Sequence, residues 1–174
     1  MNIFFLSKSV RRCARWHCDK HVVKMLLEYT QILYTSNHVN GGTSAIQDTA
    51  PLCISSGMRG YKLHAKNHPS VKWASESLAH YMWLNALALE LVREHRYRFK
   101  TMHACKEHLF WLRDHPPPGL LTKSEWLRDP PPAMPAEYRV NQQSVSCYRA
   151  YYNGAKRHIL TYTKRHFPHI LRQE

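Results

Sequence analysis

The chain has 174 residues, 44% of them hydrophobic and 11% aromatic, which argues against wholesale disorder and is enough for one packed core. Its 25 Lys and Arg outnumber 12 Asp and Glu and give a net charge of +13, which favours a polyanionic partner, usually nucleic acid. No apolar run approaches the roughly 18 residues of a membrane span, and the opening apolar residues are too few for a signal peptide, so we expect a cytoplasmic protein with no membrane partner.

The first third of the chain predicts a strand, a helix and a loop. Residues 2–6 are mostly apolar and β-prone, which predicts one short strand. Ser7 or Ser9 can then cap a helix, and apolar residues at steps of three or four predict that helix from about residue 10 to residue 34. Residues 37–60 hold most of the Gly, together with Ser and Thr, and predict a loop.

The rest of the chain predicts further helices and a proline-rich arm. Asn67-His68-Pro69 is a helix-start signal, because a cap candidate precedes a Pro in the first turn. Residues 115–137 contain seven of the ten Pro and predict an irregular, polyproline-like arm, which either packs on the helices or bounds a substrate. Helices are expected over about 70–98, 101–113 and 144–166, the last broken at Asn153-Gly154. We therefore expect a mostly α, single domain over residues 1–174, with one short N-terminal strand, about four helical segments and the arm.

One polar stripe distinguishes the first predicted helix. Steps of 4, 3, 4 and 3 link His17, His21, Lys24, Glu28 and Gln31, so these residues would share one face. Two His and a Gln in register are unusual for a solvated face, which indicates a ligand-facing wall. The alternative is an ordinary exposed face that carries an i,i+4 pair of Lys24 and Glu28.

Such a wall suits acid–base work on a bound nucleotide, with Glu28 as the carboxylate and with His17 and His21 orienting the sugar or base. Schiff-base chemistry at a sugar C1′ needs an unprotonated amine, and the candidates are the α-amino group of Met1 and the side chain of Lys24. An α-amino group, with an ordinary pKa of about 7.7 to 8, suits neutral pH better than a lysine at about 10.4. A strand that starts at residue 2 would hold this amine close to the first helix. This chemistry requires no cofactor.

The two histidines also leave a metal-dependent enzyme open. His17 and His21 are spaced i,i+4, which allows two imidazoles on one ion, and Cys18 or Asp19 is adjacent. The chain has no HExxH motif, and candidates for a third ligand are limited to His64, His68 and His80.

Basic and aromatic residues interleave over residues 8–24, 93–100 and 148–174. Cations can meet phosphates while rings stack on bases or fill an abasic gap. We expect DNA contacts from Arg11, Arg12, Arg15, Lys20, Arg96, Arg98, Lys100, Arg149, Tyr151, Tyr152, Lys156 and Arg157. The alternative is a charged surface whose aromatic rings lie inside.

The chain carries HCDKHVVKM at 17–25 with Glu28, and further His68-Pro69, Trp73, Tyr81 to Leu84, Pro131 to Tyr138 and Tyr148 to Tyr152. In this combination it resembles a family of small, largely uncharacterised proteins of tailed phages and giant viruses. The resemblance covers nearly the whole chain and implies a viral protein in the cytoplasm of an infected host cell.

A more remote resemblance rests on the N-terminal strand, on His21 and Glu28 of the first helix, on a central helix with a basic end and on a Tyr-rich C-terminal segment. These features are similar to the phage pyrimidine-dimer DNA glycosylases of the endonuclease V type. In that family the N-terminal amine attacks C1′ and a glutamate on the first helix assists, which implies these roles for the amine of Met1 and for Glu28. Asn2 is a poor context for removal of Met1, so the free amine is expected on Met1 itself. The arginine cluster that the family has beside the glutamate is replaced here by His21 and Lys24.

These inferences predict a monomeric, DNA-binding N-glycosylase that acts on damaged or modified pyrimidines and can add an abasic-site lyase step. The alternatives are a non-catalytic nucleic-acid-binding protein and a metal-dependent nuclease that uses His17 and His21.

Overall fold

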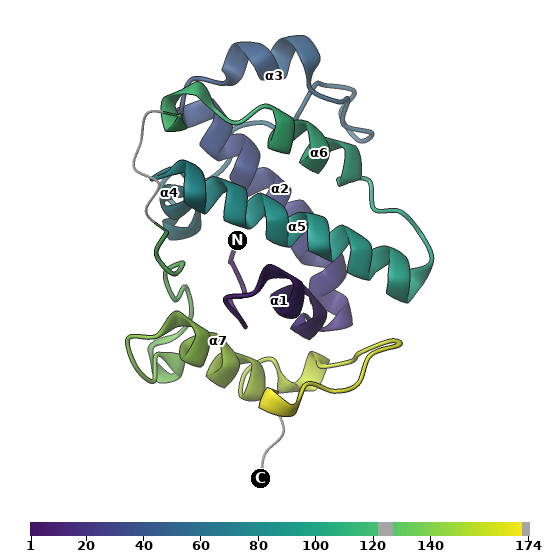
Figure 1. Cartoon of the computed structure of the whole chain (residues 1–174), viewed down its shortest axis with the longest axis vertical. Coiled ribbons are helices and arrows are strands. Elements are labelled where there is room, and N and C mark those ends of the chain that lie inside the picture. The colour runs from purple at the N-terminus through teal and green to yellow at the C-terminus, as the bar shows by residue number, and fades with distance from the viewer. Residues whose placement is uncertain (122–126, 172–174) are drawn as a thin grey trace.

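The computed structural model describes residues 1–121 and 127–171, and this part of the chain is mostly helical (Figure 1). Its α-helices are α1 (Val10–Trp16), α2 (Asp19–Val39), α3 (Thr43–Thr49), α4 (Pro69–Ala74), α5 (Leu78–Phe99), α6 (Lys106–Asp114) and α7 (Ser144–Asn153). Short 3-10 turns are η1 (Pro118–Leu120), η2 (Ala136–Tyr138), η3 (Arg157–Ile159) and η4 (His169–Leu171). The mostly α prediction is confirmed. None of these helices combines the length and the apolar character that crossing a membrane requires.

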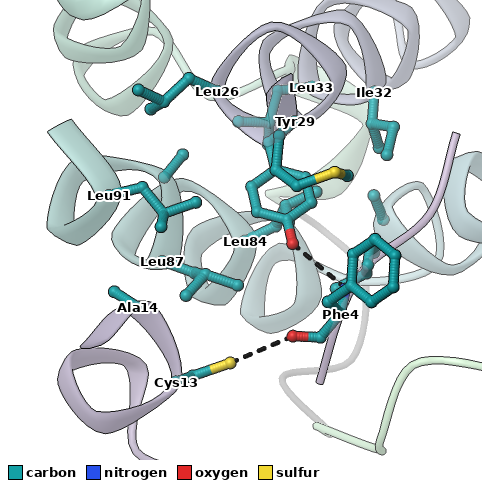
Figure 2. Packing of buried hydrophobic residues seen from close by; sticks show 14 of the residues in the cluster. Phe4, Cys13, Ala14, Leu26, Tyr29, Ile32, Leu33, Leu84, Leu87 and Leu91 are labelled. Carbon is teal, nitrogen blue, oxygen red and sulfur yellow. Dashed lines mark hydrogen bonds between the residues drawn. The ribbon is translucent and has the colours of Figure 1, made fainter. Parts of the chain in front are cut away.

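The predicted strand at residues 2–6 is wrong, since no β-strand forms within the described ranges. This segment is buried, but side chains rather than a neighbouring strand bind its backbone. The Phe4 N–H donates to the Tyr29 hydroxyl at 3.2 Å, and the Phe4 carbonyl accepts from the Cys13 thiol at 3.2 Å (Figure 2). The β-prone residues therefore reflect burial, because a short apolar run does not distinguish a strand from any other buried segment.

The single helix predicted over residues 10–34 is also wrong, because the helix is interrupted between α1 and α2. His17 has extended backbone angles (φ −63°, ψ 132°) that end α1. The guanidinium of Arg98, on α5, donates to the carbonyls of Arg15 and His17, both at 2.9 Å, and pairs with Asp19 at 3.0 Å. These bonds satisfy carbonyls that a continuous helix would have used internally, so a side chain from a distant segment stabilises the break.

α5 lies among the other helices and packs against α1, α2, α4 and α6, as predicted for a central helix (Figure 1). Its Leu84, Leu87 and Leu91 join Leu26 and Leu33 of α2 in one buried cluster (Figure 2). This cluster holds α2, and with it the side chains on the outer face of α2, in a fixed position.

The predicted helix over residues 70–98 is divided into α4 and α5. Ser77 caps α5 by accepting a hydrogen bond from the His80 N–H at 3.1 Å, and α4 has already ended. Residues 37–60 are not wholly a loop, because α3 forms within them. α7 ends at Asn153, where the sequence predicted a break, but the helix predicted to continue to residue 166 is wrong, because residues 155–166 contain no α-helix and only the 3-10 turn η3.

The described part of the proline-rich arm is irregular apart from the turns η1 and η2, and residues 122–126 of it lie outside the described residues. The arm passes beside the start of the chain. The Asn2 side-chain N–H donates to the Ala133 carbonyl at 2.8 Å, and the Tyr148 hydroxyl bonds both Asn2 and the Pro131 carbonyl. The arm therefore packs against residues 2–6 and helps to fix the position of Met1.

Candidate active site at the N-terminus

The α-amino group of Met1 meets the carboxylate of Glu28. The Met1 nitrogen lies 3.9 Å from Glu28 Oε2, and the Asn2 N–H donates to the same oxygen at 3.1 Å. The other carboxylate oxygen lies 3.3 Å from Lys24 Nζ. We call these three groups, the Met1 amine, Glu28 and Lys24, the amine site. The Glu28 side chain is only 15% exposed, whereas that of Lys24 is 70% exposed.

The position of the amine follows from burial of the segment behind it. Ile3 and Phe4 are buried, and the Phe4 ring stacks on His21 with 4.1 Å between ring centroids. Asn2 is bonded on its other side to the arm and to Tyr148. Because these contacts order the backbone as far as residue 2, the amine needs little further ordering to reach Glu28.

His68 lies near the amine site. It caps α4, and its Nδ1 accepts a hydrogen bond from the Ser70 N–H at 3.1 Å, which leaves the proton of the neutral ring on Nε2. Burial lowers the pKa of His68, the Met1 amine lowers it further by repulsion, and Glu28 opposes the shift. The His68 ring therefore lies within electrostatic range of the amine and the carboxylate, and its Nε2 makes no hydrogen bond to any described residue. In the sequence His68 was part of a helix-start motif, a possible metal ligand and one of the residues that carry the viral resemblance, but it was not predicted at the amine site.

His17 lies in the core, away from the amine site. Its Nδ1–H donates to the Cys13 carbonyl at 2.8 Å, and its Nε2 accepts from the Tyr29 hydroxyl at 3.0 Å. The ring is fully buried, and this burial lowers its pKa to about 4. His17 is thus a neutral structural residue that links α1 to α2.

His21 is likewise buried. Its Nδ1 bonds the Tyr152 hydroxyl at 2.5 Å, one ring face stacks on Phe4, and burial lowers its pKa to about 3. The prediction that His17 and His21 line one ligand-facing wall with Lys24 and Glu28 is therefore wrong for both histidines. The break after α1 removes His17 from the register of α2, and Phe4 and Tyr152 cover His21.

The donor set does not fit a metal-dependent nuclease. Both ring nitrogens of His17 bond protein atoms, and within residues 1–121 and 127–171 no three His, Cys, Asp or Glu side chains are placed to hold one ion.

Several of the predicted DNA-binding residues line one extended groove on α1 and α5. Three adjoining hollows of about 490, 440 and 530 Å³ share residues, with Arg93 and Tyr97 common to the first two and Arg11 and Arg15 common to the last two. We call this surface the arginine groove. Its cationic residues are Arg11, Arg12, Arg15, Arg93, Arg96, Lys100 and Arg165.

The carboxylates of the arginine groove neutralise only part of this charge. Glu94 pairs with Arg165 at 2.6 Å, with Arg98 at 3.2 Å and with Arg15 at 3.9 Å, and Glu90 pairs with Arg93. Of the cations that line the arginine groove, Arg11, Arg12, Arg96 and Lys100 make no ion pair with any described residue.

Two predicted DNA contacts are wrong because their side chains are buried. The Arg98 side chain is inside, between Glu94, Asp19 and the carbonyls at the end of α1. Tyr152 is fully buried, with its hydroxyl on His21. Arginine and tyrosine are typical of nucleic-acid-binding surfaces, but the Arg98 guanidinium binds groups of α1, α2 and α5 and so joins these helices.

The other predicted contacts lie at or near the surface. Arg149 bonds the Leu6 carbonyl at 3.1 Å and lies over the Trp16 ring, and Lys156 lies over the ring of Tyr151. Arg157 bonds the Leu171 carbonyl, and Lys20 is exposed on α2.

The amine site and the arginine groove share no residue. Leu26 of α2 faces the buried cluster that includes Leu91 of α5 (Figure 2). Glu28, two residues later, is about 200° further around the helix and points away from that cluster. The molecule therefore offers two separate features, an amine next to a carboxylate and a cationic groove.

Comparisons with protein-family models, with curated proteins and with solved structures each found no match.

Proposed function

We propose that the protein is a DNA N-glycosylase with an abasic-site lyase step, and that the amine site carries the chemistry. The observation that carries this proposal is the 3.9 Å separation between the Met1 nitrogen and Glu28 Oε2. A nucleophilic amine next to a carboxylate that can accept and return its proton is the pair that Schiff-base chemistry at a sugar C1′ requires.

The proposed reaction begins with the unprotonated amine of Met1 attacking C1′ of the target nucleotide. The bond from C1′ to the base breaks, and the base leaves with its electron pair and takes a proton from solvent. Glu28 accepts the proton that the attacking nitrogen loses and returns it to the sugar ring oxygen as the ring opens to the imine. Glu28, which is ionised again, then takes a proton from C2′, and the 3′ phosphate leaves with its electron pair. Water hydrolyses the imine and releases the amine.

Lys24 is the other amine in reach of Glu28. Its side chain is 70% exposed, whereas that of Met1 is 5% exposed, and a lysine is ordinarily protonated at neutral pH. We therefore assign Lys24 to charge balance with Glu28 and to contact with a phosphate of the bound strand.

Borohydride reduction tests this function, because it converts the imine into a stable covalent adduct. A duplex with one abasic site is incubated with the protein and borohydride, and peptide mass spectrometry locates the adduct. We expect it on the peptide that contains residue 1. An adduct on Lys24 would transfer the nucleophile to that residue, and an adduct elsewhere, or none, would overturn the proposal.

The carboxylate is tested with Glu28→Gln against Glu107→Gln, a change at an exposed glutamate of α6. We expect the first to bind DNA normally and to lose strand cleavage, and the second to behave as the unmodified protein.

The arginine groove supports a second candidate function, nucleic-acid binding without chemistry. Its four cations without an ion-pair partner in the described residues can each neutralise a phosphate. DNA binding that survives Glu28→Gln, combined with no trapped adduct from the unmodified protein, would favour this function.

A further inference from the structure

A second groove adjoins the amine site, between α2 and the loop of residues 53–64. Its volume is about 510 Å³, within the range of small-ligand pockets. Leu27 and Gln31 of α2 line it, and they stand immediately before Glu28 and one turn after it. Glu28 does not line the groove itself, but helix geometry places it about 60° around α2 from Gln31, on the adjoining flank.

Gln31 presents an available amide to the groove. Its side chain is half-buried, and within the described residues it makes no hydrogen bond. A primary amide has donors and an acceptor side by side, which matches the adjacent donor and acceptor on the edge of a nucleobase.

The ring of Tyr61 forms an aromatic wall of the groove, and contacts with residues outside the groove fix its orientation. Its hydroxyl lies 3.6 Å from the Cys105 sulfur, and its ring packs 5.6 Å from Tyr34 and 5.0 Å from His108 between centroids. Leu27 and Leu63 also line the groove and are 40% and 48% exposed, which is high for large apolar residues. Flat apolar walls of this kind suit the face of a base.

The loop is held in shape rather than free to close the groove. Gly60 has φ of +63°, and a Cβ there would lie 2.6 Å from Ile46 and from Tyr34, so only glycine permits this close approach. The Thr35 hydroxyl also bonds both backbone groups of His64 at 3.1 Å. The groove is therefore largely pre-formed.

The surrounding charge matches a nucleotide. Lys62 lines the groove and Lys24 precedes Glu28 by one turn, and both are exposed. Cations beside an apolar recess can meet the phosphates that flank an extruded base.

We propose that this groove receives the base of the target nucleotide, with Gln31 bonding its edge and Tyr61 stacking on its face. This inference rests on the proposed function and adds that the base itself is recognised. It places the sugar C1′ at the edge of the groove, next to Glu28.

The test compares two substrates with the variant Gln31→Leu. One duplex carries a damaged pyrimidine such as uracil or a UV photoproduct, and the other carries a preformed abasic site, which has no base to bind. Gln47→Leu, at an exposed position of α3, is the control. We expect Gln31→Leu to slow base release by at least about tenfold and to leave trapping on the abasic duplex within about twofold, because a lost hydrogen bond to a base affects only the first. Equal losses on both substrates, or no loss on either, would refute the inference.

A binding measurement separates this inference from the chemistry. Pyrimidine nucleoside monophosphates added to the ¹⁵N-labelled protein should shift the side-chain amide signals of Gln31 and leave those of Gln47 in place. Absence of that shift overturns the groove assignment, whatever the protein does to DNA. A shift at Gln31 in a protein that gives no borohydride adduct would retain the groove and discard the glycosylase function.

Discussion

Replacement of Arg98 by methionine separates what the basic C-terminus of α5 contributes to folding from what it contributes to binding. The sequence pattern predicts that Arg98 and Arg96 both contact DNA. In the structure the Arg98 side chain is enclosed, whereas Arg96 is exposed and lines the arginine groove. Arg98→Met should therefore mainly lower the unfolding free energy, whereas Arg96→Met should mainly weaken DNA binding.

The expected stability loss follows from the bonds of Arg98. Its guanidinium pairs with Glu94 at 3.2 Å and with Asp19 at 3.0 Å, and it donates to two carbonyls at 2.9 Å. Removing one partner of a buried pair costs about 3–5 kcal/mol of unfolding free energy. Glu94 keeps Arg165, and Asp19 keeps its bonds from Thr163, so we expect a loss near the lower end, about 3 kcal/mol. In a chain of this length that lowers Tm by roughly 6–12 °C.

Urea unfolding and DNA titrations over a range of salt concentrations measure the two effects. Arg96→Met should change the unfolding free energy by less than about 0.5 kcal/mol. If the four unpaired cations of the arginine groove each neutralise one phosphate, the log–log salt slope is near about −3.6, and Arg96→Met should reduce its magnitude by about 0.9. A stability loss below about 1 kcal/mol in Arg98→Met, together with a lower salt slope, would refute the assignment of Arg98 to the core.

Three further predictions concern the amine site, the groove beside it and the buried histidines. Glu28→Gln should lower the single-turnover rate of strand cleavage by about 10²–10⁴-fold at unchanged DNA affinity, and a rate within about twofold of the unmodified protein would remove Glu28 from the chemistry. Gly60→Ala should destabilise the protein by more than Gly57→Ala in thermal unfolding, because both have positive φ but only Gly60 lacks room for a Cβ, and equal losses would contradict this packing. His17 and His21 have folded-state pKa values lowered to about 4 and about 3, so their contribution to stability is complete above about pH 6.5 and falls with pH down to those values. As the pH falls through that window, each histidine should lower the unfolding free energy by up to about 1.4 kcal/mol per pH unit. Equal unfolding free energies from urea titrations at pH 7 and pH 5 would argue against two neutral buried rings.

The helical periodicity of the sequence was sufficient to predict the two long helices, α2 and α5, approximately. The apolar stripe of α5 predicted a long central helix, and most of α2 overlaps the first predicted helix, although α2 continues to Val39, past the predicted end at residue 34. Both helices bury one regular face. The sequence also placed the Met1 amine close to the first long helix, but it assigned this to a strand at residues 2–6 that does not form, and the buried segment that holds the amine was recognised only in the structure.

The tertiary structure alone decided which polar residues of the stripe reach the surface. The spacing of His17, His21 and Glu28 is compatible with one exposed face, yet Arg98 ends α1 at His17, and Phe4 and Tyr152 cover His21. The physical reason is that periodicity states how often a side chain returns to one side of a helix. What packs on that side comes from other segments, which can be 81 residues away, as Arg98 is from His17, or 131, as Tyr152 is from His21. Hydrogen bonding and desolvation by those segments determine whether a polar group becomes structural or stays available to a ligand.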